Sequence, residues 1–162
     1  MIRIAGRSDL PAIVGIYNEA VADRFATADL DPITEEGRAE WFESHDARSH
    51  PIYVAETGRA VVGWSSLTAY RGGRAAVRRT AEISYYVARA ARRQGIGRAL
   101  VEHALREAPG LGIHVLFGII LERNAGSIRL MERCGFVPWG RLPGVAEIEG
   151  ELVAHVYYGR AV

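Results

Sequence analysis

Apolar and polar residues alternate with two different periods along the chain, and these periods predict strands and helices in turn. Residues 2–5 alternate as a short strand does, and Ser8 then stands where a helix N-cap is expected. After Ser8, apolar residues recur at helical spacing at Leu10, Ile13, Val14, Tyr17 and Val21. Thr34 begins a second, shorter helix that contains Trp41 and Phe42. The first part of the chain is therefore predicted to form one strand and two helices.

The middle of the chain predicts a β-hairpin, a loop and a third strand. Residues 51–56 and 60–70 are strand-like runs, and the turn Thr57-Gly58-Arg59 separates them. Residues 71–79 are a basic loop that contains glycine, and residues 80–88 follow as a strand. The alternation of this strand places Glu82, Ser84 and Tyr86 on one face and Ile83, Tyr85 and Val87 on the other.

The last part of the chain predicts two more helices and three more strands. A helix with one apolar face follows residue 95 and ends at Pro109-Gly110, and the continuous apolar run 113–121 is typical of a central strand. A short helix at 127–134 closes at Gly135, and strands follow at 136–142 and 151–159. The order β-α-α-β-β-β-α-β-α-β-β predicts a mixed α/β fold with one core, as a single domain over residues 1–162.

Composition narrows the possible functions. Of the 162 residues 49% are hydrophobic and the net charge is +1, which favours a folded domain without a general nucleic-acid or membrane partner. All 20 basic residues are arginines, so lysine-based chemistry such as a Schiff base is excluded. With one cysteine and five scattered histidines, neither an internal disulfide nor a metal site is expected. No signal-peptide pattern is present, and we expect a cytoplasmic protein.

The stretch "VARAARRQGIGRAL" places glycines and arginines at the start of the third predicted helix. The first N–H groups of a helix have no partner within it, and the helix dipole adds partial positive charge there. Glycine lets a ligand approach the backbone closely, and arginine can add ion pairs. The residues therefore favour a pyrophosphate site, although an ordinary solvated helix start in an arginine-rich chain has the same composition.

Two motifs in this order resemble the GCN5-related N-acetyltransferase superfamily. Arg92-x-x-Gly95-x-Gly97 lies between a strand and a helix, and "NAGSIRLMERCGF" resembles the second coenzyme segment of that superfamily. The segments "IYNEAV", "AEWFESH", "PIYVAE" and "AEISYYV" are similar to the phosphinothricin and methionine-sulfone acetyltransferase branch. The resemblance covers essentially the whole chain. It implies a seven-stranded, mostly antiparallel sheet whose fourth and fifth strands splay around the coenzyme.

The resemblance implies acetyl-coenzyme A as the acetyl donor. The backbone at the start of the third helix would hold the pyrophosphate, and the N–H of Val87 would polarise the thioester carbonyl. Asn124 would face the pantetheine arm or the sulfur, although Asn124 and Ser127 could equally be helix-capping residues. The residues assigned to coenzyme binding are Val87, Arg92, Arg93, Gly95, Ile96, Gly97, Arg98, Asn124 and Ser127.

Glu82 is the candidate general base. A primary amine must lose a proton before it attacks the acetyl group, and a carboxylate beside the acetyl group can accept that proton. Glu82 lies among apolar and aromatic residues, where burial should raise its pKa, and it matches a glutamate of the branch. The alternative is a surface glutamate paired with Arg78 or Arg79. The general acid stays unassigned, because Met131 occupies the position of the family's tyrosine or histidine. Cys134 is expected to be a packing residue.

The acceptor implied by the branch is a small amino-acid-like amine. Arg71 and Arg78, in or beside the basic loop, are the candidates to bind its carboxylate, although either can be a solvated loop residue. Tyr17 and Thr27 are expected to roof the acceptor pocket, with a core role as the alternative for Tyr17.

The last hairpin departs from the branch. Ile148, Leu152 and Ala154 replace its lysine, tryptophan and aspartate, and the glutamates 147, 149 and 151 make the hairpin acidic. A cationic amine or a protein N-terminus is therefore an alternative acceptor, and an acyl-coenzyme A sensor with weak catalysis is an alternative function. The branch also implies a homodimer.

Overall fold

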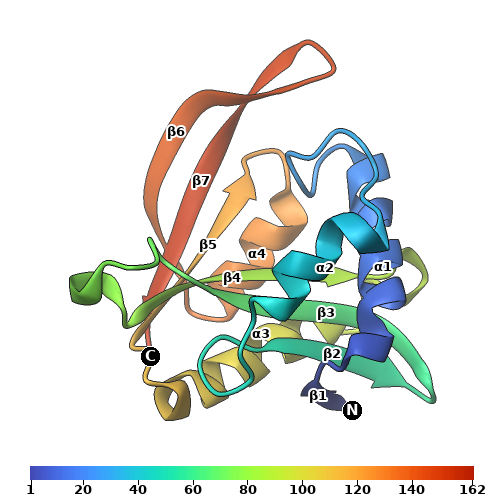
Figure 1. Ribbon diagram of the computed structural model, residues 1–162. Coiled ribbons are helices and arrows are strands. Elements are labelled where there is room, and N and C mark those ends of the chain that lie inside the picture. The colour runs from blue at the N-terminus through green and yellow to red at the C-terminus, as the bar shows by residue number, and fades with distance from the viewer.

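Seven strands form one sheet in the order β1-β2-β3-β4-β5-β7-β6, and four α-helices pack on it (Figure 1). The computed structural model describes all 162 residues. The strands are β1 (Ile2–Ile4), β2 (Ile52–Thr57), β3 (Ala60–Ala69), β4 (Thr80–Val87), β5 (Val115–Leu121), β6 (Val137–Ile148) and β7 (Glu151–Ala161). The helices are α1 (Leu10–Asp23), α2 (Glu35–Glu43), α3 (Ile96–Glu107) and α4 (Ala125–Arg133). The predicted order of elements and the mixed, mostly antiparallel sheet are confirmed.

Helices cover both faces of the sheet, and each face has its own apolar core. One cluster of 16 buried residues joins the sheet to α3 and α4, and it includes Ile83, Leu100 and Met131. A second cluster of seven residues lies beneath α1 and α2 and is built around Trp64, whose indole N–H donates to the carbonyl of Ile13 at 3.1 Å. The two faces of β4 therefore lie against different helices, as its alternation predicts.

β4 and β5 form the only parallel pair of the sheet, and they pair over a short length. Their register runs from Thr80 opposite Val115 to Glu82 opposite Phe117, and no pairing continues beyond it. β3 follows β4 as far as Val87, and β7 follows β5 to its end. The sheet is therefore split between β4 and β5 from residue 83 onward, as the resemblance implies.

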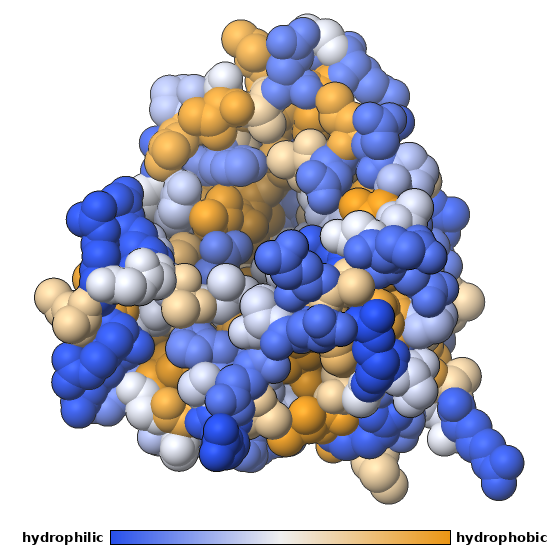
Figure 2. All heavy atoms as spheres, in the orientation of Figure 1, coloured by the Kyte–Doolittle hydropathy of each residue, from blue (hydrophilic) through white to orange (hydrophobic).

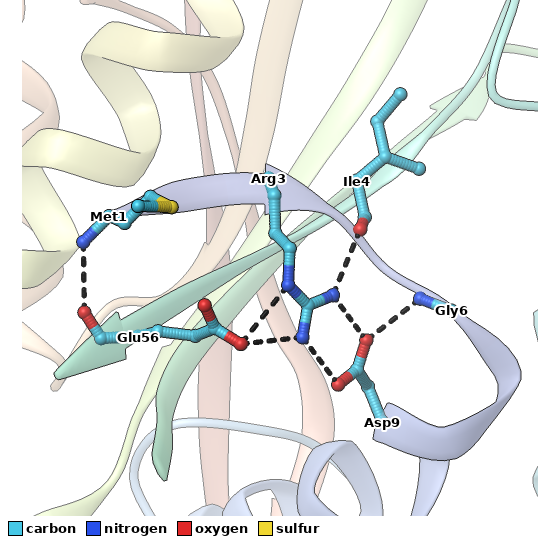
Figure 3. Close-up of polar contacts among 6 residues, drawn as sticks. All are labelled: Met1, Arg3, Ile4, Gly6, Asp9 and Glu56. Carbon is cyan, nitrogen blue, oxygen red and sulfur yellow. Dashed lines mark hydrogen bonds and ion pairs between the residues drawn. The ribbon is translucent and has the colours of Figure 1, made fainter. Parts of the chain in front are cut away.

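A buried carboxylate anchors the first strand to the first helix. The guanidinium of Arg3 contacts both oxygens of Asp9 at 2.7 and 2.9 Å and also reaches Glu56 at 2.6 Å (Figure 3). Asp9 also accepts the Gly6 N–H at 2.7 Å, and its relative exposure is only 7%. These contacts, led by the hydrogen bond from Arg3, hold the pKa of Asp9 below its usual range.

Several boundaries differ from the predictions, and three of the differences have a clear physical reason. Ser8 does not cap α1, because a 3-10 turn at Arg7–Asp9 precedes the helix. The carboxylate of Asp9 accepts the Gly6 N–H at the start of this turn. α4 begins at Ala125 rather than at residue 127, because the Asn124 side chain caps it. β6 extends to Ile148, well past the predicted end, because it pairs with β7 through two register shifts. Long-range pairing, which local propensity does not report, lengthens this strand.

Candidate active site

The open edge of β4 offers backbone groups without a strand partner. Ala88 N–H donates to Val62 O on the β3 side at 2.9 Å. Because successive N–H groups of a strand point to opposite edges, the Val87 N–H points toward the split. Backbone polar groups that lack a partner inside a protein are costly. This edge is therefore prepared for a ligand that carries its own amide or carbonyl groups.

A cavity of about 910 Å³ occupies the split. Residues 83–87 of β4 and 118–120 of β5 form its walls, and the starts of α3 and α4 close it. All nine residues that the sequence assigns to coenzyme binding line this cavity. Figure 2 shows the molecule hollowed on the side of α1 and α2, beneath the β6–β7 hairpin, with hydrophobic atoms in the hollow. The split and the helix starts thus form one concave site of the size that small-molecule ligands use.

The start of α3 has the geometry of an anion site. Its N-cap is Gly95, with φ 84°, and no side chain caps the free N–H groups of the first turn. Arg93 also has a positive φ, of 63°, so the loop turns twice in the left-handed region before the helix begins. A Cβ at Gly97 would lie 2.9 Å from Leu130 Cδ1 of α4. The start of α3 therefore packs against α4 as closely as a glycine permits, and the first residues of α3 line the cavity.

The arginines around this cavity divide into paired and unpaired groups. Arg92 binds Asp23 of α1 at 2.6 Å and donates from Nε to Val87 O at 3.1 Å, while Arg98 pairs with Glu102 at 2.7 Å. The side chains of Arg92 and Arg98 are therefore occupied by contacts within the protein. Their backbone groups remain available to a ligand in the cavity. The cavity-lining arginines that form no ion pair are Arg93, Arg129 and Arg133. The last two were missed from the sequence, although their i,i+4 spacing places them on one side of α4.

Asn124 and Ser127 connect α4 to β4. Asn124 Oδ1 accepts the Ser127 N–H at 3.1 Å, which is the capping role expected as an alternative. The Ser127 hydroxyl lies 2.7 Å from the Tyr85 hydroxyl. Burial raises the pKa of Tyr85 above its usual range, so this phenol stays protonated. The Tyr85 hydroxyl and the Asn124 amide thus both contact Ser127 on the cavity wall.

Met131 is fully buried and has no part in the cavity. Its relative exposure is 0%, and its methyl carbon lies 2.9 Å from where a Cβ on Gly118 of β5 would stand. Cys134 is also buried in the same core, and burial raises the pKa of its thiol. Both side chains are packing groups, so the hydroxyl of Tyr85 is the donor that the cavity wall offers near this turn of α4.

Glu82 lies at the point where the sheet splits. It is half-buried, and burial alone raises its pKa. The expected alternative, a pair with Arg78 or Arg79, does not form: Arg78 donates to Ala75 O at 3.0 Å, and Arg79 lies 3.3 Å from His114 Nδ1. Glu82 does not line the cavity itself, but Ser84 and Tyr86 on its own face of β4 do. The carboxylate is therefore an unpaired group at the base of the split.

The residues predicted for the acceptor lie apart from the cavity. The Tyr17 hydroxyl bonds to Thr27 at 2.7 Å and to Asp29 at 2.5 Å, and burial raises the pKa of Tyr17 to about 12. Tyr17 itself is a core residue, with 6% exposure. Arg71 and Arg78 are exposed, and the Arg71 guanidinium lies 5.7 Å from the centre of the Tyr70 ring. The structure thus brings Tyr17 and Thr27 into contact with each other, whereas Arg71 and Arg78 remain exposed and away from the cavity.

The acidic hairpin is partly neutralised by arginines of other segments. Glu149 lies 4.0 Å from Arg24 at the end of α1, and Glu151 lies 3.7 Å from Arg123. The Arg123 guanidinium also donates to the Arg24 carbonyl. Two of the three glutamates therefore have cationic partners within the chain.

The side chains form no group of three or more His, Cys, Asp or Glu that is arranged to hold a metal ion. None of the helices has the length and apolar character needed to cross a membrane.

Comparisons with known proteins agree with this geometry. The model of the acetyltransferase (GNAT) family matches residues 13–136. A Bacillus subtilis (strain 168) protein provisionally named phosphinothricin acetyltransferase is 44% identical over 151 residues, which cover 93% of this chain and 91% of the relative. The L-methionine sulfoximine/L-methionine sulfone acetyltransferase of Pseudomonas aeruginosa is 35% identical over 147 residues, which cover 90% of this chain and 85% of the relative.

A solved structure adds a ligand to the comparison. The phosphinothricin acetyltransferase of Sinorhizobium meliloti, solved in complex with acetyl-coenzyme A, superposes with a TM-score of 0.93 at 29% identity. The match covers 100% of this chain and 88% of that one.

Proposed function

The chain belongs to the GNAT acetyltransferase family, and we propose that it transfers an acetyl group from acetyl-coenzyme A to the primary amine of a small amino-acid-like acceptor. The observation that carries this proposal is the split between β4 and β5, which ends in one cavity at the uncapped start of α3. Relatives named for phosphinothricin, methionine sulfone and L-amino acids support the class of acceptor.

The residues of the cavity fit the coenzyme. The free N–H groups of Ile96, Gly97 and Arg98 suit the pyrophosphate, with Arg93 as an added cation. Val87 offers a backbone N–H at the open edge, Asn124 and Ser127 lie at the other wall, and Gly95 gives the turn its shape. Arg92 acts by orienting Val87 and fastening the loop to α1. When bound, the coenzyme supplies the acetyl thioester.

Glu82 is the proposed general base. The acceptor amine is protonated near neutral pH, and the Glu82 carboxylate accepts this proton directly or through one water molecule. Its raised pKa makes it a better base than an exposed glutamate, and it has no ion pair to lose. The Val87 N–H stabilises negative charge that develops on the carbonyl oxygen.

Tyr85 is the proposed donor to the departing sulfur. Its hydroxyl lines the split beside Ser127 and stays protonated because its pKa is raised. Because a thiol is more acidic than this phenol, Tyr85 donates a hydrogen bond to the thiolate rather than a complete proton. Solvent then protonates the released thiolate.

The acceptor carries a carboxylate in this proposal, and Arg71 and Arg78 remain candidates to bind it. Arg71 lies over Tyr70, whose ring packs 5.3 Å from Phe117, the register partner of Glu82. Tyr17 and Thr27 support the roof above the acceptor side. A cationic acceptor has less support, because Glu149 and Glu151 of the hairpin already face arginines.

The experiment is a measurement of thiol release from acetyl-coenzyme A with a panel of amines. Methionine sulfone and phosphinothricin should be acetylated, whereas their carboxamides and polyamines should be poor acceptors. Calorimetry with acetyl-coenzyme A alone gives binding independently of turnover. Tight binding without thiol release for any amine would favour an acyl-coenzyme A sensor and contradict the proposed enzyme.

We expect the protein to be a homodimer, as the branch resemblance implies. β6 is an edge strand whose apolar side chains are open to solvent, and Val137, Trp139 and Val145 are each more than half exposed. Such a surface favours association. Light scattering after size-exclusion chromatography tests this, and a monomer at micromolar concentration would contradict it.

A further inference from the structure

One arginine of α2, Arg38, forms no ion pair. The guanidinium carbon of Arg38 lies 3.8 Å from the centre of the Trp41 ring and 5.2 Å from that of Tyr17. Arg38 forms no ion pair, and its Nε is shielded from solvent without a hydrogen-bond partner. A half-buried cation is costly unless it is paired, so its lack of a partner calls for a physical reason.

Arg38 lies on the same side of the sheet as Glu82. Trp41 packs at 5.7 Å on Trp64, and Trp64 packs at 4.8 Å on Tyr86, which shares its face of β4 with Glu82. Figure 1 shows α2 lying over β3 and β4 on this side. The cation and the proposed base therefore lie on the same side of the sheet and are linked through a row of packed aromatic rings.

His45, just after α2, marks the other end of this region. Its ring packs on Trp41 at 4.6 Å, and its Nε2 lies 3.4 Å from Thr68 Oγ1. Thr68 is the cross-strand partner of Glu82. The side chains of α2 and of the residues just after it thus reach from Arg38 to Thr68, the position opposite Glu82.

The residues around Arg38 fix the position of its guanidinium but leave it without an ion pair, so that it can bind an anion. Stacking on Trp41 orients the planar guanidinium at little cost in entropy. Asp29 is the nearby carboxylate, and its Oδ2 already accepts the Tyr17 hydroxyl at 2.5 Å. Arg71 and Arg78 differ, because both are exposed and Arg78 bonds to its own loop at Ala75. Among these three arginines, Arg38 is the one held by packing and left without a partner.

We propose that Arg38 binds an oxyanion of the acceptor, and this inference rests on the acceptor class proposed above. The oxyanion is either the α-carboxylate or an acidic oxygen of the side chain, as in a phosphinate. An oxyanion there would receive two parallel N–H donors and would neutralise the half-buried cation. Arg38 thereby sets the specificity of the enzyme for acidic acceptors.

The test uses Arg38→Gln and Arg38→Lys in the full-length protein, with Arg59→Gln as the matched control. Arg59 is an exposed arginine in the β2–β3 turn, and it forms no ion pair. Arg38→Gln should raise the KM of phosphinothricin, which carries both a carboxylate and a phosphinate, at least tenfold and leave the KM of acetyl-coenzyme A unchanged. Arg38→Lys should recover part of the loss, and Arg59→Gln should behave as the wild type.

Two pairs of acceptors distinguish the source of the oxyanion. If Arg38 binds the α-carboxylate, the wild type should acetylate the carboxamide of methionine sulfone poorly. Arg38→Gln should then cause no further loss of activity toward this carboxamide, because it lacks the carboxylate that Arg38 would bind. If Arg38 binds a side-chain oxyanion, phosphinothricin should lose far more than methionine sulfone, whose side chain is neutral. Arg71→Ala run in parallel shows which arginine carries the α-carboxylate.

A merely structural role gives a different result. Loss of packing on Trp41 would lower the melting temperature of Arg38→Gln and leave the acceptor KM unchanged, which would overturn the inference. Direct binding of phosphinothricin, measured by calorimetry in the presence of coenzyme A, separates this inference from the proposed function. Wild-type binding that Arg38→Gln abolishes supports the oxyanion site even without turnover. Equal binding by both proteins overturns the site while turnover remains.

Discussion

Glu82 on β4 lies opposite Phe117 on β5, and this pair is the last at which the two parallel strands meet. The strand edges beyond it are free, so the carboxylate stands at the base of the split whose walls form the cavity. In the proposed function, a base at this place would be close to both an acyl group that enters along the split and an amine that enters beneath α2.

Gly97→Glu should weaken binding of acetyl-coenzyme A by at least about 2 kcal/mol, because it adds a negative charge where the free N–H groups of α3 point. Gly97→Ala is the control for volume alone. Its Cβ would lie 2.9 Å from a terminal methyl group of Leu130, which can move, so its effect should be much smaller. Calorimetry that shows equal affinity for wild type and a folded Gly97→Glu protein would refute the site.

Glu82→Gln should keep coenzyme binding and lose about 100-fold or more in turnover, as expected for removal of a general base. Glu36→Gln, at an exposed position of α2, should have no effect. The check is the steady-state rate of thiol release at saturating acceptor. A variant that retains most of the wild-type rate would leave Glu82 with a structural role only.

The pH dependence gives a second test of Glu82. The base works when it is ionised, so activity should fall at low pH as Glu82 becomes protonated. Because burial raises its pKa, this fall should occur at a higher pH than for an ordinary glutamate, whose pKa is about 4.3. Glu82→Gln should lack this acidic limb. An identical limb in the variant would mean that another group titrates.

Tyr85→Phe should lower turnover by roughly 10- to 100-fold, the value of a hydrogen bond to a charged group, with little change in the KM of acetyl-coenzyme A. Ser127→Ala is the comparison, because it removes the partner of the Tyr85 hydroxyl and keeps the phenol. We expect the smaller loss in Ser127→Ala. Equal rates for Tyr85→Phe and wild type would show that solvent alone meets the departing sulfur.

Asp9→Asn should destabilise the protein by about 2 kcal/mol near neutral pH, because it removes the charge that Arg3 contacts through two hydrogen bonds. The folded-state pKa of Asp9 lies below its unfolded value, so the wild-type advantage is present above about pH 4 and is lost as pH falls below it. Urea unfolding at pH 7 and pH 3 measures both values. A difference that persists unchanged at pH 3 would contradict the ionic origin.

The sequence by itself determined the order of the elements and identified nine residues that line one cavity. The reason is that both depend on local patterns. Apolar periodicity marks strands and helices, and the glycines at 95 and 97 mark a helix start whose N–H groups are free. The nine residues assigned to the coenzyme lie around one cavity because they come from a few short segments next to β4 and β5.

The tertiary structure alone decided which charged groups are free to act. Arg92 and Arg98 look like ligand-binding cations in the sequence, yet Arg92 is held by Asp23, nearly 70 residues away, and Arg98 by Glu102. Arg38 looks like an ordinary surface residue of a short helix, yet it is half-buried, stacked on Trp41 and without an ion pair. The availability of a charge depends on what packs against it in space, and contacts between distant segments leave no local pattern in the sequence.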